Sequence, residues 1–98
     1  ESVRRFHYDR AFIGASGITE DGVFSCQNAI ESEVKRAAIA QSERIVVVSD
    51  SSKVGHSAFS IFARPSDIHM LITDATPATR ALAARAPFEV LLVGEEET

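Results

Sequence analysis

Apolar residues along this chain gather in short runs that are separated by amphipathic or polar segments. Six runs have the length and composition of strands: residues 10–15 (RAFIGA), 23–24, 44–49 (RIVVVS), 58–63, 70–73 (MLIT) and 88–93 (FEVLLV). The run at 44–49 is continuously apolar and rich in valine, which is typical of a strand covered on both faces in a parallel sheet. The pair Val23–Phe24 is expected to form only a short edge strand.

Two segments between these runs have helical signals. Asn28 is a predicted N-cap, and Glu31 three residues later completes a capping box for a helix over Ala29–Ser42. Its predicted core-facing stripe consists of Ile30, Val34, Ala37 and Ala38. Glu31 and Lys35 are spaced for an i,i+4 ion pair on the solvent side.

A second helix is predicted to begin after the N-cap Thr76, with Pro77 at its first position, and to end near Ala86 before Pro87. Strands that alternate with helices at this spacing predict an α/β fold with a mainly parallel sheet flanked by helices. Residues 1–6 (ESVRRF) are interpreted as the last turn of a helix, and we expect the chain to be a fragment of a longer polypeptide. Residues 95–98 are expected to be an acidic tail.

Composition narrows the possible functions. The 98 residues suffice for one small domain, and the net charge of −4 with scattered basic residues argues against direct binding of nucleic acid. The lone Cys26 excludes an internal disulfide and is expected to be a packing residue in a cytoplasmic protein. His7, His56 and His69 have no metal-ligand spacing, so we predict neither a metal nor a cofactor. No apolar run approaches the ~20 residues of a membrane span.

The polar segment after the valine run is the strongest candidate for chemistry. Lys53 can act as a point charge toward a phosphate, while Ser51 and Ser52 offer hydroxyl and backbone N–H donors. Gly55 allows the backbone to approach a ligand closely. The alternative is a solvated turn in which Asp50 pairs with Lys53, and spacing alone does not decide between the two.

A second loop follows the first predicted strand. Gly14, Ser16 and Gly17 can present backbone donors to a ligand, although glycine patterns of this kind are common in ordinary turns. Glu33 lies near the start of the first helix, where most glutamates only complement the helix dipole. Both loops leave strands at their carboxyl ends, where ligands bind in open α/β sheets.

Five segments in order, DRAFIGASGI, SEVKRAAI, VVVSDSSKVG, SDIHMLITD and FEVLLV, make the chain similar to a known family. It resembles the C-terminal effector domain of DeoR-type bacterial transcription regulators, over nearly its whole length. The resemblance implies a Rossmann-related fold like that of sugar-phosphate isomerases, and a phosphorylated sugar as effector. Lys53 would contact the phosphate, the Gly14–Gly17 loop would face the sugar, and Glu33 would border the pocket. The predicted ligand-binding set is Asp50, Ser51, Ser52, Lys53, Gly14, Ser16, Gly17 and Glu33.

The resemblance also implies that two parts of the family's regulators are not included in this sequence. The family's N-terminal winged helix-turn-helix and its phosphate-cradling loop are both outside this sequence, so DNA would be bound only through that absent domain, in a homo-oligomer. The related deaminases carry Gly-x-Asp-Gly-His, whereas this chain has Gly14-Ala15-Ser16-Gly17-Ile18. A serine cannot serve as a carboxylate base, which favours a sensor over the alternative, a sugar-phosphate isomerase or deaminase. A plain interaction module is a third alternative.

Overall fold

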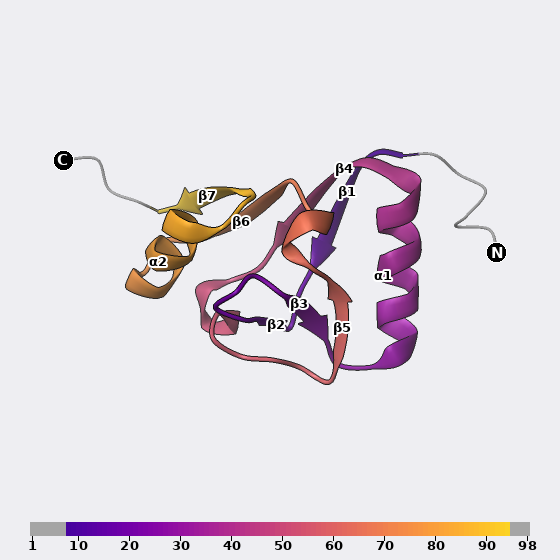
Figure 1. Cartoon of the computed structure of the whole chain (residues 1–98), viewed down its shortest axis with the longest axis horizontal. Helices are drawn as coiled ribbons and strands as arrows, with labels where there is room; N and C mark the ends of the chain where they lie inside the picture. Colours follow the sequence, from indigo (N-terminus) through magenta and orange to yellow (C-terminus); the bar gives the residue numbers. More distant parts are fainter. Residues whose placement is uncertain (1–7, 95–98) are drawn as a thin grey trace.

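The computed structural model describes residues 8–94 (Figure 1). In chain order the elements are β1 (Tyr8–Gly14), β2 (Gly17–Ile18), β3 (Phe24–Cys26), α1 (Ala29–Gln41), β4 (Ser42–Val48), the 3-10 turn η2 (Ser51–Lys53), β5 (Ser60–Ala63), the 3-10 turn η3 (Pro65–Asp67), β6 (Met70–Asp74), α2 (Pro77–Arg85) and β7 (Glu89–Val93). The predicted helix end at residues 1–6 and the predicted tail at 95–98 lie outside the described residues.

The main sheet has four parallel strands in the order β1-β4-β6-β7. Phe12 is in register with Val46, and Val46 with Met70, so the strand centres align across the sheet. Helix α1 lies in the connection from β1 to β4, and α2 in the connection from β6 to β7. The predicted α/β class with a mainly parallel sheet is confirmed.

A second sheet was not anticipated from the sequence. Strands β2, β3 and β5 form a three-stranded antiparallel sheet in which β3 is central. The prediction of an edge strand at Val23–Phe24 was therefore wrong in its position, since Phe24 pairs with both Ile18 and Ala63. Strands of two to four residues carry too little periodicity to reveal their partners in the sequence.

The predicted stripe on α1 is wrong at Ile30 and Val34, but it is confirmed at Ala37, which is buried, and at Ala38, which packs against the core. Ile30 is 77% exposed and Val34 is 56% exposed, whereas Ser32 is completely buried and Ala37 is 7% exposed. The helix turns its Ser32 face inward because the hydroxyl has polar partners there: it donates to Ser60 Oγ at 2.5 Å and lies 3.3 Å from Cys26 Sγ. A satisfied buried hydroxyl replaces the apolar contact that the pattern predicted.

The predicted N-caps Asn28 and Thr76 are confirmed, but among the described residues the Glu31 side chain makes no return bond to the Asn28 backbone, so the capping box predicted there does not form. Asn28 Oδ1 accepts a hydrogen bond of 2.8 Å from the backbone N–H of Glu31 at the start of α1. At α2, the Thr76 hydroxyl accepts from the N–H of Thr79, and Thr79 Oγ1 accepts from the N–H of Thr76, with Pro77 in the first turn. The caps determine the residue at which each helix begins, and therefore where the chain leaves the preceding loop to form the helix.

The hydrophobic core lies on one face of the parallel sheet, which we call the core face. Ile13, Val47 and Leu71 point from neighbouring strands into it and meet Phe24 and Phe62 of the small sheet. The expectation that the valine strand is covered on both faces holds only in part among the described residues. Val47 is completely buried, but its neighbour Val48 is 45% exposed on the opposite face.

Candidate functional site

The carboxyl ends of three parallel strands meet at one edge of the sheet. Ser49, directly after β4, donates its hydroxyl to the carbonyl of Ala15 at 3.2 Å and its backbone N–H to the carbonyl of Ile72 at 3.1 Å. These bonds join the end of β4 to the loop after β1 and to β6. The two loops that were predicted to carry ligand chemistry therefore lie at one edge, as expected for parallel strands.

The turn η2 is held at this edge by two carboxylates. Asp50 caps it by accepting from the N–H of Ser52 at 2.9 Å and from the Ser52 hydroxyl. Asp74, at the end of β6, accepts from the Ser51 N–H at 2.6 Å and from the Ser51 hydroxyl at 2.7 Å. Each carboxylate thus binds one serine through both its backbone and its side chain.

These bonds lower the pKa of both carboxyl groups. The side-chain and backbone donors of Ser52 lower the pKa of Asp50 from 3.8, and the Lys53 charge adds a smaller effect in the same direction. The hydroxyl and N–H of Ser51 lower the pKa of Asp74 in the same way. Hydrogen bonds to the charged form stabilise it, so both groups are ionised and weakly basic near neutral pH.

Lys53 is half-buried at the end of η2, and its backbone N–H donates to the carbonyl of Asp50 at 3.2 Å. Within residues 8–94, its ammonium has no hydrogen bond and no ion pair closer than 4.0 Å. The predicted alternative, an Asp50–Lys53 pair, is not what holds this turn, because Ser52 is the main partner of Asp50. The Lys53 ammonium remains available for an anion.

The loop after β1 places its glycines in different surroundings. Gly14 is exposed, and its carbonyl accepts from the Lys35 ammonium at 2.5 Å. Ser16 donates its N–H to the carbonyl of Ser25 at 2.9 Å. Gly17 is buried in β2, where an added Cβ would lie 2.7 Å from Ser25 Oγ and 2.8 Å from the Ala58 nitrogen. Gly17 therefore has a packing role, and its contact with a ligand stays a prediction.

Glu33 is exposed on α1 and makes no contact with the η2 turn that the structure records. Its neighbour Lys35 was expected to pair with Glu31, but its ammonium reaches Gly14 and lies 5.1 Å from the centre of the Phe62 ring. Sequence reasoning thus missed Lys35 and Asp74 as members of this edge. The signal for Asp74 was present, since it ends a parallel strand just as Asp50 follows one.

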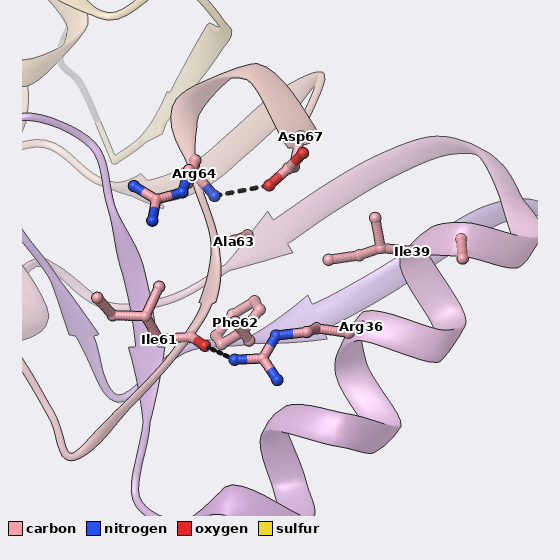
Figure 2. A pocket seen from close by; sticks show the side chains of 8 residues that line it. Arg36, Ile39, Ile61, Phe62, Ala63, Arg64 and Asp67 are labelled. Atoms are coloured by element: carbon pink, nitrogen blue, oxygen red, sulfur yellow. Dashed lines mark hydrogen bonds between the residues drawn. The ribbon is translucent and has the colours of Figure 1, made fainter.

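A separate cavity of about 390 Å³ lies between α1 and β5 (Figure 2). None of the predicted site residues lines it. Figure 2 shows the Arg36 guanidinium turned to the carbonyl of Ile61, and the Asp67 carboxylate turned to the backbone nitrogen of Arg64 at 2.8 Å. Its walls include Ile39 and Phe62. The Arg36 guanidinium and the Asp67 carboxylate are engaged with the backbone, which leaves the Arg64 guanidinium as the cation that this cavity offers. The sheet edge is the better candidate site, because loops from three strands meet there in one hydrogen-bonded arrangement.

Two further classes of site are absent from residues 8–94. No cluster of three or more histidine, cysteine or carboxylate side chains is placed to bind a metal ion. No helix in the same part of the chain is long and apolar enough to span a membrane.

The sequence is similar to a known family of sensor domains and to several transcriptional repressors. A family model described as the DeoR C terminal sensor domain matches residues 1–75. The chain is 33% identical over 99 residues to the HTH-type transcriptional repressor GlcR of Bacillus subtilis (strain 168). It is 35% identical over 97 residues to a putative aga operon transcriptional repressor of Escherichia coli O157:H7. Over 73 residues it is 34% identical to the transcriptional repressor AccR of Agrobacterium fabrum.

The matches cover most of this chain but a minority of each relative. They span 99%, 97% and 74% of the chain, against 38%, 36% and 28% of the GlcR, aga operon and AccR repressors respectively. The region of similarity to GlcR and the aga operon repressor includes the whole described fold. More than half of each relative lies outside the region that this chain resembles.

Proposed function

This chain belongs to the family of DeoR C-terminal sensor domains, and from that premise we propose that its sheet edge forms part of a binding site for a phosphorylated sugar. In the longer regulator, occupation of the site would control DNA binding by a separate domain. The family and the names of the relatives support a role in transcription regulation. The ligand class and the residues that bind it are our inference from the chemistry of the edge.

One observation carries the proposal: the Lys53 ammonium has no partner among the described residues, on a turn that is otherwise fully hydrogen-bonded. A lysine that is half-buried and unpaired loses some hydration without compensation, so an anion that supplies it is bound favourably. Asp50 and Asp74 already hold the backbone around Lys53 in place. A ligand would therefore have to order little of this turn, which reduces the entropy cost of binding.

The carboxylates at this edge are poor candidates for catalysis. A general base works best when its pKa lies near the operating pH, and the lowered pKa of both Asp50 and Asp74 makes them weaker bases. Ser16 occupies the position where the related deaminases carry an aspartate. These features favour a sensor over the alternative of a sugar-phosphate isomerase or deaminase.

In the proposed mechanism, the effector acts through its differential affinity for two states of the regulator. A ligand that binds both states equally shifts no equilibrium, however tightly it binds. A site divided between this sheet edge and another part of the protein would meet this requirement, because the ligand would favour the state in which the two parts are close. DNA half-sites are commonly read by paired modules, so we expect a homo-oligomer.

The test uses the protein expressed from its complete reading frame and a panel of triose, pentose and hexose phosphates. Thermal unfolding should show an increase in Tm with one or more phosphates, and none with the matching unphosphorylated sugars, because binding to the folded state alone stabilises it. Lys53→Ala should weaken binding of that phosphate about 10- to 100-fold, the usual effect of losing a charge-assisted hydrogen bond.

Arg64→Ala is the matched control, because it removes a cation from the separate cavity and leaves the sheet edge intact. It should bind the phosphate like the wild type. Loss of binding in Arg64→Ala with full binding in Lys53→Ala would move the site to the cavity. Chemical turnover of any phosphate in the panel would replace the sensor by the enzyme alternative, and an absence of binding across the panel would favour an interaction module.

A further inference from the structure

The cavity between α1 and β5 combines charged groups with apolar walls. Its volume of about 390 Å³ lies within the range of small-molecule pockets, roughly 300–1,000 Å³. Three ionised side chains line it: Arg36 from α1, and Arg64 and Asp67 from the chain that follows β5. The rest of its lining is apolar and includes Ile39 and Phe62. A cavity of this composition can bind a ligand that is itself part charged and part apolar.

Among residues 8–94, the Arg64 guanidinium is the cation of this cavity that has neither a hydrogen bond nor an ion pair. The Arg64 backbone N–H, in contrast, donates to the Asp67 carboxylate at 2.8 Å. A guanidinium carries five N–H donors in a planar fork, and this fork can bind both oxygens of a carboxylate through two parallel hydrogen bonds. An anion at Arg64 would therefore receive donors that the described residues leave unused.

Arg36 places a second guanidinium across the cavity, from α1 to β5. It donates an N–H to the carbonyl of Ile61, which leaves further donors of the same group for a ligand (Figure 2). This bond holds the guanidinium in place before a ligand binds, so less side-chain entropy is lost on binding. A third cation is close by, because the Lys35 ammonium lies 5.1 Å from the centre of the Phe62 ring. The surroundings of the cavity thus favour an anion.

Charge and polarity together indicate the class of ligand. The lining carries two positive charges, on Arg36 and Arg64, and one negative charge, on Asp67, so a monoanion neutralises the remaining positive charge. A phosphate monoester carries about −1.5 to −2 near pH 7 and would be repelled more strongly by Asp67. Sugar hydroxyls would lose water against Ile39 and Phe62 without gaining partners, whereas an apolar group gains free energy by covering these walls.

We propose that this cavity is a second ligand site, which binds a small carboxylate with an apolar aliphatic or aromatic body. The carboxylate binds the guanidinium of Arg64, with that of Arg36 beside it, and the apolar body packs against Ile39 and Phe62. None of the residues assigned to the sheet edge lines this cavity. The second site therefore goes beyond the function proposed above and does not depend on it.

The experiment measures binding to the protein from its complete reading frame by isothermal titration calorimetry. The probes are phenylacetate and isocaproate, and their controls are phenylacetamide and isocaproamide, which keep the shape but lose the charge. At least one carboxylate should bind, and its amide should bind at least about ten-fold more weakly.

Three variants locate the site, and the Tm of each confirms that it is folded. Arg64→Ala should weaken binding of the carboxylate about 10- to 100-fold, because it removes a charge-assisted hydrogen bond. Ala40→Phe places a ring at the cavity without changing any charge, and it should weaken binding by at least about ten-fold. Arg10→Ala is the matched control. It removes an exposed cation on β1 that does not line the cavity, and it should bind like the wild type.

Three results would overturn the proposal. If neither carboxylate binds at millimolar concentrations, the cavity does not take this class of ligand. If an acid and its amide bind equally, the guanidinium groups do not recognise the ligand. If both Arg64→Ala and Ala40→Phe bind like the wild type, the carboxylate binds elsewhere on the protein. No sugar phosphate is present and Lys53 is unchanged in every variant, so a failure here is distinct from a failure of the function proposed above.

Discussion

The two faces of the parallel sheet have nearly the same residue types but very different surroundings. On the core face, Val47 and Leu71 are completely buried. On the opposite face, which we call the outer face, Val46 is 4% exposed, but Val48 and Leu91 are 45% and 50% exposed. Side chains alternate between the faces along each strand, so hydrophobicity alone cannot tell which face the chain covers. The order of the strands decides it. Among the described residues the strands follow one another in one direction, β1-β4-β6-β7, and right-handed crossovers then place every connection on the core face. Four predictions about the stability of variants of the 98-residue chain test and extend this comparison.

The largest effect is expected from a matched pair of leucine truncations. Leu71→Ala should lower the free energy of unfolding by about 2–5 kcal/mol, since it removes a completely buried side chain and leaves a cavity. Leu91→Ala on the outer face should change it by no more than about 0.5 kcal/mol. Urea unfolding of both variants checks this. Equal losses would mean that both faces are already buried in the 98-residue chain.

The next effect distinguishes two glycines near the sheet edge. Gly17→Ala should destabilise the fold by about 1–3 kcal/mol, because its Cβ would meet the Ala58 nitrogen at 2.8 Å and the His56 carbonyl at 2.9 Å. Gly14→Ala has only the Val48 carbonyl at 3.9 Å as a neighbour and should be tolerated. Thermal unfolding of the pair measures the difference. If Gly17→Ala is tolerated, the backbone of the small sheet around Gly17 can shift to make room for the added Cβ.

A smaller gain is expected from a buried threonine on the core face. Among the described residues, Thr73 Oγ1 is buried without a hydrogen-bond partner. Thr73→Val should therefore raise the free energy of unfolding by about 1 kcal/mol. Thr79→Val is the matched control and should destabilise, because the Thr79 hydroxyl donates to the carbonyl of Asp74 at 2.8 Å. A loss of stability in Thr73→Val would reveal a partner for that hydroxyl.

The smallest effect is the acid dependence of the sheet edge. Because the folded pKa of Asp74 lies below its unfolded value of 3.8, this group stabilises the fold above about pH 4, and the contribution is lost as the pH falls through the folded pKa. Ser51→Ala removes the hydroxyl that lowers this pKa most. Its stability deficit should be present at pH 7 and shrink toward pH 3. Ser57→Ala, an exposed serine, should show no such trend.

Much of the candidate site could be predicted from the sequence, because its residues follow strands directly. Lys53, Ser51 and Asp50 come after the valine run, and the parallel arrangement brings that loop to the same edge as Gly14. Lys35 could not be assigned, since a lysine at i+4 from a glutamate equally predicts a solvent-exposed pair. Its contact with Gly14 spans 21 residues and depends on how α1 packs against β1.

The sequence by itself determined the parallel strands, the two capped helices and the polar turn after the valine run. These depend on local signals: β-branched runs, capping side chains and proline or glycine at fixed offsets. Only the tertiary structure decided the small antiparallel sheet, the inward turn of Ser32 and the burial of one sheet face but not the other. Those features arise from pairings between residues far apart in the chain and from the handedness of its crossovers, which no local pattern records.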